Sequence, residues 1–331
     1  MLDPVIAAVR RAARESLRPF EGSGARVLVA LSGGADSLAL AAAVAHEAPR
    51  AGLEPWAVTV DHGLQDGSAD VAARAARQAE ELGIAHARVV RVDVGADGGP
   101  EAAAREARYA AIRRVAEDAG GAAAVLLAHT LDDQAETVLL GLARGSGAAS
   151  LQGMAPRRTD ERGLAWVRPL LALRRDDTRA FCERTGLEPW ADPHNADARF
   201  ARVRVRERLL PALERELGPG VAEALARTAE QLREDNDAFA DMIEEIIEDI
   251  VEPAEAGIAV SVAALAANPA ALRGRIIRHV VSSEFGVALT RSQTLEVARL
   301  AIDWRGQGPI DLPECQATRA NGWIVFTASA Q

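Results

Sequence analysis

The sequence predicts an α/β protein: a parallel sheet with helices on both faces, followed by a smaller, mainly helical C-terminal domain. Short apolar segments alternate with longer helical patterns from residue 26 onward, which is the βαβ order of a parallel sheet. The chain changes character after the GPG turn at 218–220, beyond which long helical patterns take over. We therefore expect two domains, 1–216 and 217–331.

The expected strands of the first domain are short and apolar, and a helical segment follows each of them. The strands cover 26–31, 56–60, 87–94 and 123–128, and the helices cover 36–47, 67–82, 100–119 and 131–143. Residues 145–175 are rich in Gly, Pro and Arg, which predicts a loop with one strand at 165–171. A helix over 174–185 and an arginine-dense helix complete this domain.

The second domain begins with a long acidic helical pattern over 221–250. A short strand over 258–262, helices near 268–303 and a final strand over 322–328 follow. Because the chain has 331 residues and 49% of them are hydrophobic, it can fill both cores. Cys182 and Cys315 lie far apart and form no CxxC pair, so the sequence indicates neither a disulfide framework nor a cysteine metal site.

Composition also restricts location and chemistry. No apolar run approaches the ~20 residues that span a bilayer, so we expect a soluble, cytoplasmic protein without a membrane partner. All 38 basic residues are arginine, which excludes mechanisms that use a protein Schiff base, a lysine adenylate or a P-loop lysine. The net charge is -10, yet residues 157–215 hold 14 arginines against 10 acidic residues. This segment is the only basic one, and a polyanionic partner is expected to bind there.

The motif SGGADS follows the first strand directly and opens the next helix. Gly33 and Gly34 allow a ligand to approach the backbone, while Ser32, Ser37 and the amides of the helix N-terminus can donate to phosphate oxygens. An ordinary glycine turn would explain the glycines but neither the serines nor Asp36. The motif lacks the GK[ST] of a Walker A loop and the third glycine of GxGxxG. It therefore predicts a phosphate site that needs no lysine.

Two further polar segments follow strands of the same sheet. DHGL, with Asp61 and His62, ends the second strand, and AHTLDDQAETVLL, with His129, ends the fourth. Because the carboxyl ends of parallel strands meet at one edge, the three polar segments should open onto a common crevice.

Charged side chains on two of the expected helices lie close to this edge. Asp132, Asp133 and Glu136 stand near one helical face and can bind Mg²⁺ or act as a general base; the alternative is an acidic first turn that satisfies the helix dipole. Another helical face combines acidic, basic and aromatic side chains: Glu101, Arg105, Arg108 and Tyr109. It is either a solvated, salt-bridged face or a clamp for phosphate or substrate.

Together the motifs resemble a known family. SGGxDS after a strand is similar to the PP-loop of N-type ATP pyrophosphatases, which cleave ATP between its α and β phosphates. The segments EAAAREARY, LDDQAET, ARGSGAASLQGM, RPLL, WADPHN and RVRVRERLLP follow in the order seen in tRNA(Ile)-lysidine synthetases, and the resemblance covers about two thirds of the chain. The missing cysteine pairs argue against the related tRNA thiolases.

The resemblance implies a two-step reaction, with ATP and Mg²⁺, on the wobble cytidine of a tRNA(Ile) that has a CAU anticodon. The cytosine C2 oxygen attacks the ATP α-phosphate and pyrophosphate leaves. The ε-amine of free L-lysine then attacks C2 and displaces AMP, which gives lysidine. A smaller domain over 217–331 is expected to help hold the tRNA.

The resemblance and the chemistry of the side chains assign roles to individual residues. ATP contacts are expected from the PP-loop and the two other junctions: Ser32, Gly33, Gly34, Ala35, Asp36, Ser37, Asp61, His62 and His129. Catalytic roles are expected for Asp36, Arg108, Asp133 and Glu136, the last two at the lysine ammonium, and Mg²⁺ is expected at Asp36 and Asp132. Substrate or tRNA contacts are expected from Glu101, Arg105, Arg144, Arg168, Asp192, Asn195, Arg199, Arg202, Arg204 and Arg206.

Three positions depart from the family pattern: Gln65 stands for Arg, His194 for Ser and Val203 for Asn. For the arginines after residue 198, an exposed, ion-paired helix is the alternative to tRNA binding. The alternatives for the whole chain are another PP-loop ligase or amidotransferase acting on a different RNA or a small molecule, and an ATP-binding module without turnover. The oligomeric state stays open, a homodimer included.

Overall fold

The computed structural model describes residues 3–63, 67–92, 100–118, 120–145, 147–192, 197–255 and 257–329, with the backbone alone for 100–102. The chain divides into two compact units, which we call the N-terminal unit (Met1–Arg233) and the C-terminal unit (Glu234–Gln331). The boundary that the sequence predicts after residue 216 lies at the turn between α9 (Leu210–Leu217) and α10 (Val221–Ile250), ahead of this division.

The centre of the N-terminal unit is a sheet in the strand order β3-β2-β1-β4-β6-β5. Neighbouring strands are parallel except for β5, which is antiparallel to β6. The strands are β1 Arg26–Ala30, β2 Glu54–Asp61, β3 His86–Arg91, β4 Ala122–Leu126, β5 Arg157–Thr159 and β6 Ala165–Val167. The predicted parallel sheet is confirmed, and β5 adds an edge strand to a segment for which the sequence predicts a loop.

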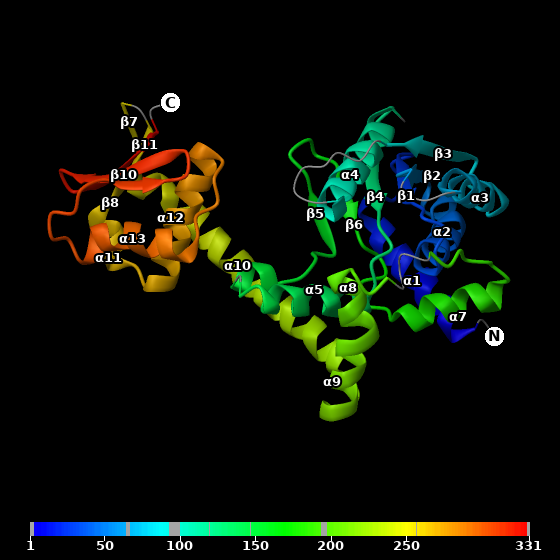
Figure 1. Cartoon of the computed structure of the whole chain (residues 1–331). Helices are drawn as coiled ribbons and strands as arrows, with labels where there is room; N and C mark the ends of the chain where they lie inside the picture. Colours follow the sequence, from blue (N-terminus) through cyan, green and yellow to red (C-terminus); the bar gives the residue numbers. More distant parts are fainter. Residues whose placement is uncertain are drawn as a thin grey trace. The chain divides into compact units, whose positions relative to one another are not determined.

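Helices cover both faces of this sheet (Figure 1). Side chains of β1 alternate between the two faces: Val27 and Val29 pack with Leu38 of α2, whereas Leu28 packs with Ile112 of α4. The first core also contains side chains of α1, α3 and α7, so these helices share the face of α2. The bounds are α1 Pro4–Leu17, α2 Ala35–Glu47, α3 Ser68–Glu81, α4 Pro100–Asp118 and α7 Arg175–Thr185.

A helical run after residue 200 packs against α5 (Leu131–Ala143), the helix that follows β4. It consists of α8 (Ala201–Arg204), the π-helical turn η4 (Val205–Leu209) and α9. Ala135 of α5 shares a small buried cluster with Val205, Leu210 and Ala222. The remaining short helices of this unit are η1 Arg18–Phe20, η2 Pro49–Ala51 and α6 Ala148–Leu151.

The C-terminal unit packs helices on a second, antiparallel sheet in the order β7-β8-β11-β10-β9. Alternate strand residues, such as Cys315 and Ala317 of β10, face Ile276 and Val280 of α12. The elements are β7 Val251–Ala254, β8 Gly257–Ser261, α11 Val262–Ala267, α12 Ala270–Phe285, α13 Arg291–Ile302, β9 Ile310–Leu312, β10 Cys315–Ala320 and β11 Trp323–Ala328. The two strands predicted here are β8 and β11, while β7, β9 and β10 carry too little apolar pattern to be predicted from sequence.

Two consequences follow for function. Because β1 lies between β2 and β4, the connections that follow β1 and β4 leave from neighbouring carboxyl ends, which is where open α/β sheets bind ligands. Across the part of the chain that the structure describes, no helix has both the length and the apolar character needed to cross a membrane.

Candidate functional site

A cavity of about 900 Å³ opens at the carboxyl edge of the sheet in the N-terminal unit. All three polar junctions line it: Ser32 after β1, Asp61 and His62 after β2, and His129 and Asp133 after β4. Arginines from α4, from the start of α7 and from the α8–η4 run complete its wall. The structure therefore brings together the three segments that the sequence places at one sheet edge.

Contacts of Ser37 with Ser32 and Gly34 stabilise the PP-loop, residues 32–37. The Ser37 hydroxyl, which is buried, donates to the Gly34 carbonyl at 3.0 Å and lies 3.1 Å from both the backbone N and the Oγ of Ser32. Gly33 has φ +83°, a conformation that strains any residue with a Cβ, and its carbonyl accepts from the Trp190 N–H at 2.8 Å. Ser32 is exposed, so its side chain remains accessible to a ligand.

The amino terminus of α2 points its free N–H groups toward the same cavity. Gly34 is the N-cap residue, and within the described chain no side chain caps this helix. Gly34, Ala35 and Ser37 all line the cavity. Because the first N–H groups of a helix carry partial positive charge, this corner suits an anionic ligand such as a phosphate.

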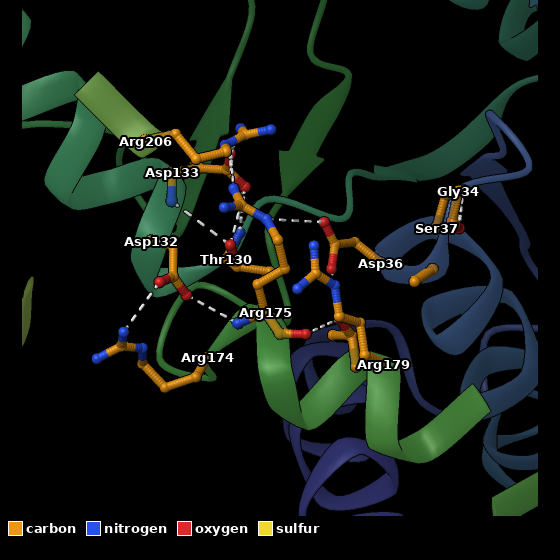
Figure 2. Close-up of polar contacts among 12 residues, drawn as sticks. Gly34, Asp36, Ser37, Thr130, Asp132, Asp133, Arg174, Arg175, Arg179 and Arg206 are labelled. Atoms are coloured by element: carbon orange, nitrogen blue, oxygen red, sulfur yellow. Dashed lines mark hydrogen bonds and ion pairs between the residues drawn. The ribbon is translucent and has the colours of Figure 1, made fainter. Parts of the chain in front are cut away.

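Asp36 lies in the first turn of α2 and faces the cavity. Its carboxylate accepts a hydrogen bond from the Thr178 hydroxyl and lies 3.7 Å from Arg175 Nε (Figure 2). Burial raises the pKa of Asp36, and the hydroxyl and the guanidinium only partly offset that effect. A carboxylate in this setting is stabilised by an additional cation.

The junction after β2 combines a fixed carboxylate with a neutral imidazole. Asp61 is buried and accepts from the Gly63 N–H at 2.9 Å; hydrogen bonds from Ser68 and Gly63 hold its pKa below the ordinary value. Burial lowers the pKa of His62, and Arg108 lowers it further. The Nδ1 atom of His62 is buried and has no hydrogen-bond partner among the described residues. Asp61 therefore shapes the turn, while His62 keeps a ring nitrogen for a ligand.

His129, which follows β4, resembles His62 in its lowered pKa and in a ring nitrogen that has no partner among the described residues. Burial lowers its pKa to about 4, and its Nδ1 is also buried without a hydrogen-bond partner in the described chain. At neutral pH both cavity imidazoles are therefore uncharged and can each offer one nitrogen as a donor or acceptor.

Asp133 lies in the first turn of α5 and forms a capping box with the N-cap residue Thr130. Its Oδ2 accepts from the Thr130 N–H at 2.8 Å and from the Thr130 hydroxyl at 3.0 Å, while its Oδ1 faces Arg175 Nη2 at 2.9 Å. Burial raises the pKa of Asp133, but Arg175 and the Thr130 N–H outweigh it, so the pKa lies below the ordinary value. Asp133 is thus a buried carboxylate anion that lines the cavity.

Glu136, one turn further along α5, is fully buried and is surrounded by three arginines. Arg206 binds it through two nitrogens, with Nε 2.7 Å from Oε1 and Nη2 3.0 Å from Oε2. Arg175 Nη2 lies 3.2 Å from Oε1, and Arg202 Nε lies 3.5 Å from Oε2. Glu136 itself does not line the cavity, so its contact with a ligand requires a change among these arginines.

Asp132 does not line the cavity. The structure therefore does not place Asp36 and Asp132 together as a pair for Mg²⁺, in contrast to the sequence-based expectation. The Asp132 carboxylate accepts from the backbone N–H of Arg175 at 2.7 Å and lies 3.1 Å from Arg174 Nη2 (Figure 2). Arg174 in turn binds Glu223 of α10 at 2.6 Å. Consecutive residues of a helix point in different directions, so only Asp133 of the two neighbours faces the cavity.

The face of α4 predicted from its spacing also lines the cavity. Arg105 stacks on the Tyr109 ring and reaches its hydroxyl at 3.3 Å. Arg108 lines the cavity and makes no ion pair or hydrogen bond within the described part of the chain, which leaves its guanidinium for an anionic ligand. The side chain of Glu101 lies outside what the structure describes.

The predicted substrate and tRNA residues fall into two groups. Arg202, Arg206 and Asp192 line the cavity. Four arginines do not: Arg168 is buried and donates to the Ala155 carbonyl at 2.7 Å, whereas Arg144, Arg199 and Arg204 are exposed.

Local contacts explain the positions of two exposed arginines. Arg199 pairs with Asp197 at 2.6 Å, and Arg204 donates to the carbonyls of Ala198 and Arg199. Val203, which departs from the family pattern, is buried. The predicted Asn195 lies outside the described residues, as do Gln65 and His194.

Sequence reasoning missed the first turn of α7. Arg175 contacts carboxylates on α2 and α5, Thr178 supports Asp36, and Trp190 closes over the PP-loop. One signal was available: Arg174 and Arg175 stand at the N-terminus of α7, where a basic residue opposes the helix dipole, although Asp176 and Asp177 of the same turn match it. Basic residues placed against the helix dipole indicate partners elsewhere in the fold.

Family comparisons agree with this architecture. A PP-loop domain family matches residues 7–213, and a TilS substrate binding domain matches residues 261–325. A tRNA(Ile)-lysidine synthase from Leifsonia xyli is 62% identical over 304 residues, which cover 92% of this chain and 90% of the relative. A protein of the same name from Thermobifida fusca is 47% identical and covers 98% of both chains, and one from Mycobacterium tuberculosis is 49% identical over 92% of this chain and 90% of its own.

Among solved structures, the chain is similar to the U34-tRNA thiolase NcsA from Methanococcus maripaludis with its [4Fe-4S] cluster. The TM-score is 0.59 at 21% identity, and the match covers 70% of this chain and 80% of that one. This likeness concerns the fold. In the present chain both cysteines are buried and lie in different units, and the described residues hold no group of three or more side chains suited to a metal ion.

Proposed function

The chain belongs to the tRNA(Ile)-lysidine synthase family, and we propose that it joins free L-lysine to the wobble cytidine of a tRNA(Ile) with a CAU anticodon. ATP is consumed and leaves as AMP and pyrophosphate. One observation carries the proposal: a single cavity combines a phosphate-binding loop, unpaired or displaceable arginines and buried carboxylates able to receive an ammonium group.

The PP-loop side of the cavity is suited to the first step, in which the cytosine attacks ATP. The uncapped N-terminus of α2 and the exposed Ser32 hydroxyl are suited to the β and γ phosphates, which become the leaving pyrophosphate. Arg108, free of protein partners in the described chain, is suited to the charge that develops as the cytosine oxygen attacks the α-phosphate. His62 and His129 are neutral and suit the nucleoside or the base.

Mg²⁺ fits one corner of the site. Asp36 is a cavity-lining carboxylate whose burial favours a nearby cation, and Mg²⁺ commonly takes one or two carboxylates together with phosphate oxygens and water. When bound, the ion would neutralise charge on the leaving pyrophosphate. We assign this role to Asp36 alone, since Asp132 is held by Arg174 and by the Arg175 backbone.

The α5 side of the cavity is suited to the second step, in which lysine attacks C2. An incoming ε-ammonium needs acceptors to hold it and a base to remove its proton before the amine can attack C2. Asp133 and Glu136 are the carboxylates at hand, and both are paired with arginines in the free protein. We assign to them the binding of the lysine ammonium.

The tRNA is the ligand for the basic segment. Arg202 and Arg206 lie at the cavity, while Arg144, Arg199 and Arg204 are exposed outside it and suit backbone phosphates. The C-terminal unit, which holds the matched substrate binding domain, is proposed to bind the body of the tRNA. The division into a catalytic domain 1–216 and a tRNA-binding domain 217–331 is part of this proposal, as are a cytoplasmic location and a homodimer.

The deciding experiment measures incorporation of labelled lysine into tRNA in the presence of ATP. We expect incorporation into tRNA(Ile) with the CAU anticodon and none when that anticodon is replaced. Pyrophosphate release without incorporation would favour a PP-loop ligase with another acceptor. ATP binding without any pyrophosphate release would favour a module that does not turn over.

A further inference from the structure

Arg206 occupies the position that the proposed lysine ammonium requires. Within the described residues, its ion pairs are to two of the three carboxylates of α5: Nε to Glu136 Oε1 at 2.7 Å, Nη2 to Glu136 Oε2 at 3.0 Å and Nη2 to Asp133 Oδ1 at 3.4 Å. With Arg175 and Arg202 added, each Glu136 oxygen faces two guanidinium nitrogens. A carboxylate oxygen has two lone-pair sites. Hydrogen bonds from Arg206 and Arg175 occupy three of the four sites on Glu136, and Arg202 forms an ion pair without a hydrogen bond beside the fourth, so little acceptor capacity is left for a substrate.

The net charge of the cluster also leaves no place for an additional cation. The cluster contains three carboxylates, Asp36, Asp133 and Glu136, and three guanidiniums, those of Arg175, Arg202 and Arg206. It is therefore neutral as it stands. An extra ammonium would leave an unpaired positive charge in a largely buried setting, which is costly unless another cation leaves.

Of the three arginines, Arg206 is the one that is free to leave. Arg175 is tied to the fold through its backbone N–H at Asp132 and through its contact with Asp36. Arg202 donates to the Thr137 hydroxyl at 2.8 Å and reaches only Glu136 among the carboxylates. Arg175 contacts the same two carboxylates as Arg206 but is also held by Asp36. The departure of Arg206 vacates acceptor positions on Glu136 and Asp133 together without breaking a contact to Asp36.

The backbone at Arg206 supports such a movement. Arg206 lies in η4, a π-helical turn between two α-helical segments. π-helical turns are rare and occur frequently at functional sites, and relaxing one toward α-helical geometry rotates the side chains it carries. A released Arg206 would remain at the cavity, in the basic segment proposed to meet the tRNA phosphates.

We propose that Arg206 holds the place of the substrate ammonium in the free enzyme and that tRNA, by drawing the guanidinium onto its phosphates, opens the site for lysine. Arg206 thereby becomes the residue that sets the order of substrate binding. The inference rests on the proposed function, because it takes Asp133 and Glu136 as the lysine-binding carboxylates. Thermodynamic linkage makes the effect reciprocal: tRNA strengthens lysine binding by the same factor as lysine strengthens tRNA binding.

The test is equilibrium dialysis of labelled L-lysine against the full chain without ATP, so that binding is measured without reaction. For the wild-type protein we expect tRNA(Ile) with the CAU anticodon to strengthen lysine binding by about tenfold, which is within the usual range of coupling between sites. Arg206→Met should bind lysine about tenfold more tightly than the wild type in the absence of tRNA. Addition of tRNA should then strengthen its lysine binding much less.

Two controls separate this effect from a general opening of the cavity. Arg215→Met removes an exposed arginine of α9 whose partner is Glu216, and its lysine binding should match that of the wild type. Norleucine has the lysine backbone and an apolar side chain without the ammonium, so its binding should not change in Arg206→Met.

The inference is overturned if Arg206→Met binds lysine no more tightly than the wild type, or if tRNA strengthens lysine binding equally in both. Should the variant fail to fold, as judged by thermal melting, the wild-type comparison with and without tRNA decides, and no tRNA effect overturns the inference. Lysine incorporation by the wild type is measured in parallel. Absence of incorporation refutes the proposed function, whereas incorporation together with an unchanged Arg206→Met refutes only the role of Arg206.

Discussion

The guanidinium of Arg206 forks across the fully buried carboxylate of Glu136, with Nε 2.7 Å from Oε1 and Nη2 3.0 Å from Oε2. Glu136 also forms ion pairs with Arg175 and Arg202, so the three arginines share one acidic side chain in addition to their other partners. These ion pairs connect α5 to the start of α7 and to the α8–η4 run.

We expect Glu136→Gln to lower the free energy of unfolding by about 3 kcal/mol, because removing one partner of a buried ion pair leaves uncompensated charge. Urea denaturation measures the change, and Glu216→Gln, at an exposed position, should stay within about 0.5 kcal/mol of the wild type. Adding Arg206→Met to Glu136→Gln should recover part of the loss. Equal destabilisation by the glutamine variants at 136 and 216 would show that the cluster contributes nothing to stability.

We expect Asp36 and Asp132 to differ in their relation to Mg²⁺. Asp36→Asn should reduce pyrophosphate release by ~100-fold or more and raise the Mg²⁺ concentration needed, because the carboxylate faces the cavity. Asp132→Asn should leave the Mg²⁺ requirement unchanged and instead lower stability by about 1–3 kcal/mol, since it loosens Arg174 and the start of α7. A magnesium titration of pyrophosphate release in each variant separates the two roles, and a shared shift in both would contradict the assignment to Asp36 alone.

Arg204→Ala should mainly weaken tRNA binding. The side chain is exposed and donates only to main-chain carbonyls in the described structure, so ATP binding should be unaffected. If the guanidinium contacts a phosphate, the slope of log Kd for tRNA against log salt concentration falls by about 1. Filter binding across a salt series tests this, with Arg11→Ala, an exposed position on α1 outside the basic segment, as the matched change. An unchanged slope removes Arg204 from the proposed tRNA surface.

The neutral state of His129 predicts a stability change with pH. Its pKa is about 4 in the fold against 6.5 ordinarily, so the unfolded chain binds the extra proton first as pH falls. Above pH 6.5 the imidazole is neutral in both states and the lowered pKa has no effect on stability; between pH 6.5 and about 4 it reduces the stability of the fold progressively, because only the unfolded chain is protonated. Near pH 5.5 the loss should amount to about 1 kcal/mol, and His129→Gln should flatten this part of the profile. Identical profiles for both proteins from pH 7 to 5 would refute the assignment.

Much of the cavity was predictable because its parts are local to the sheet. Strand order and the rule that parallel strands share a carboxyl edge are enough to bring Ser32, Asp61 and His129 to one place. The helical spacing of Arg105 and Arg108 was likewise sufficient to place both at the same wall.

Other features required the tertiary structure. Spacing on α5 could not tell whether Asp132 or Asp133 faces the ligand, because the rotation of the helix about its own axis is fixed by packing against Val205, Leu210 and Ala222. Arg175 reaches Asp36 and Asp133 across long stretches of sequence that no local pattern connects. The polar strand β10 forms only because its neighbours β9 and β11 supply hydrogen bonds on both edges.

The division between the compact units falls inside α10 rather than in a loop. The first half of that helix carries Glu223, which binds Arg174, and Arg233, which donates to the carbonyls of Gln152 and Met154. A fragment trimmed at the preceding glycine turn would therefore lose the contacts that α10 makes to Arg174 and to the backbone carbonyls of Gln152 and Met154. Anyone dissecting this enzyme into autonomous pieces should retain the chain through Arg233, and a protease that nicks the glycine turn is not expected to release a self-sufficient ATP-cleaving half.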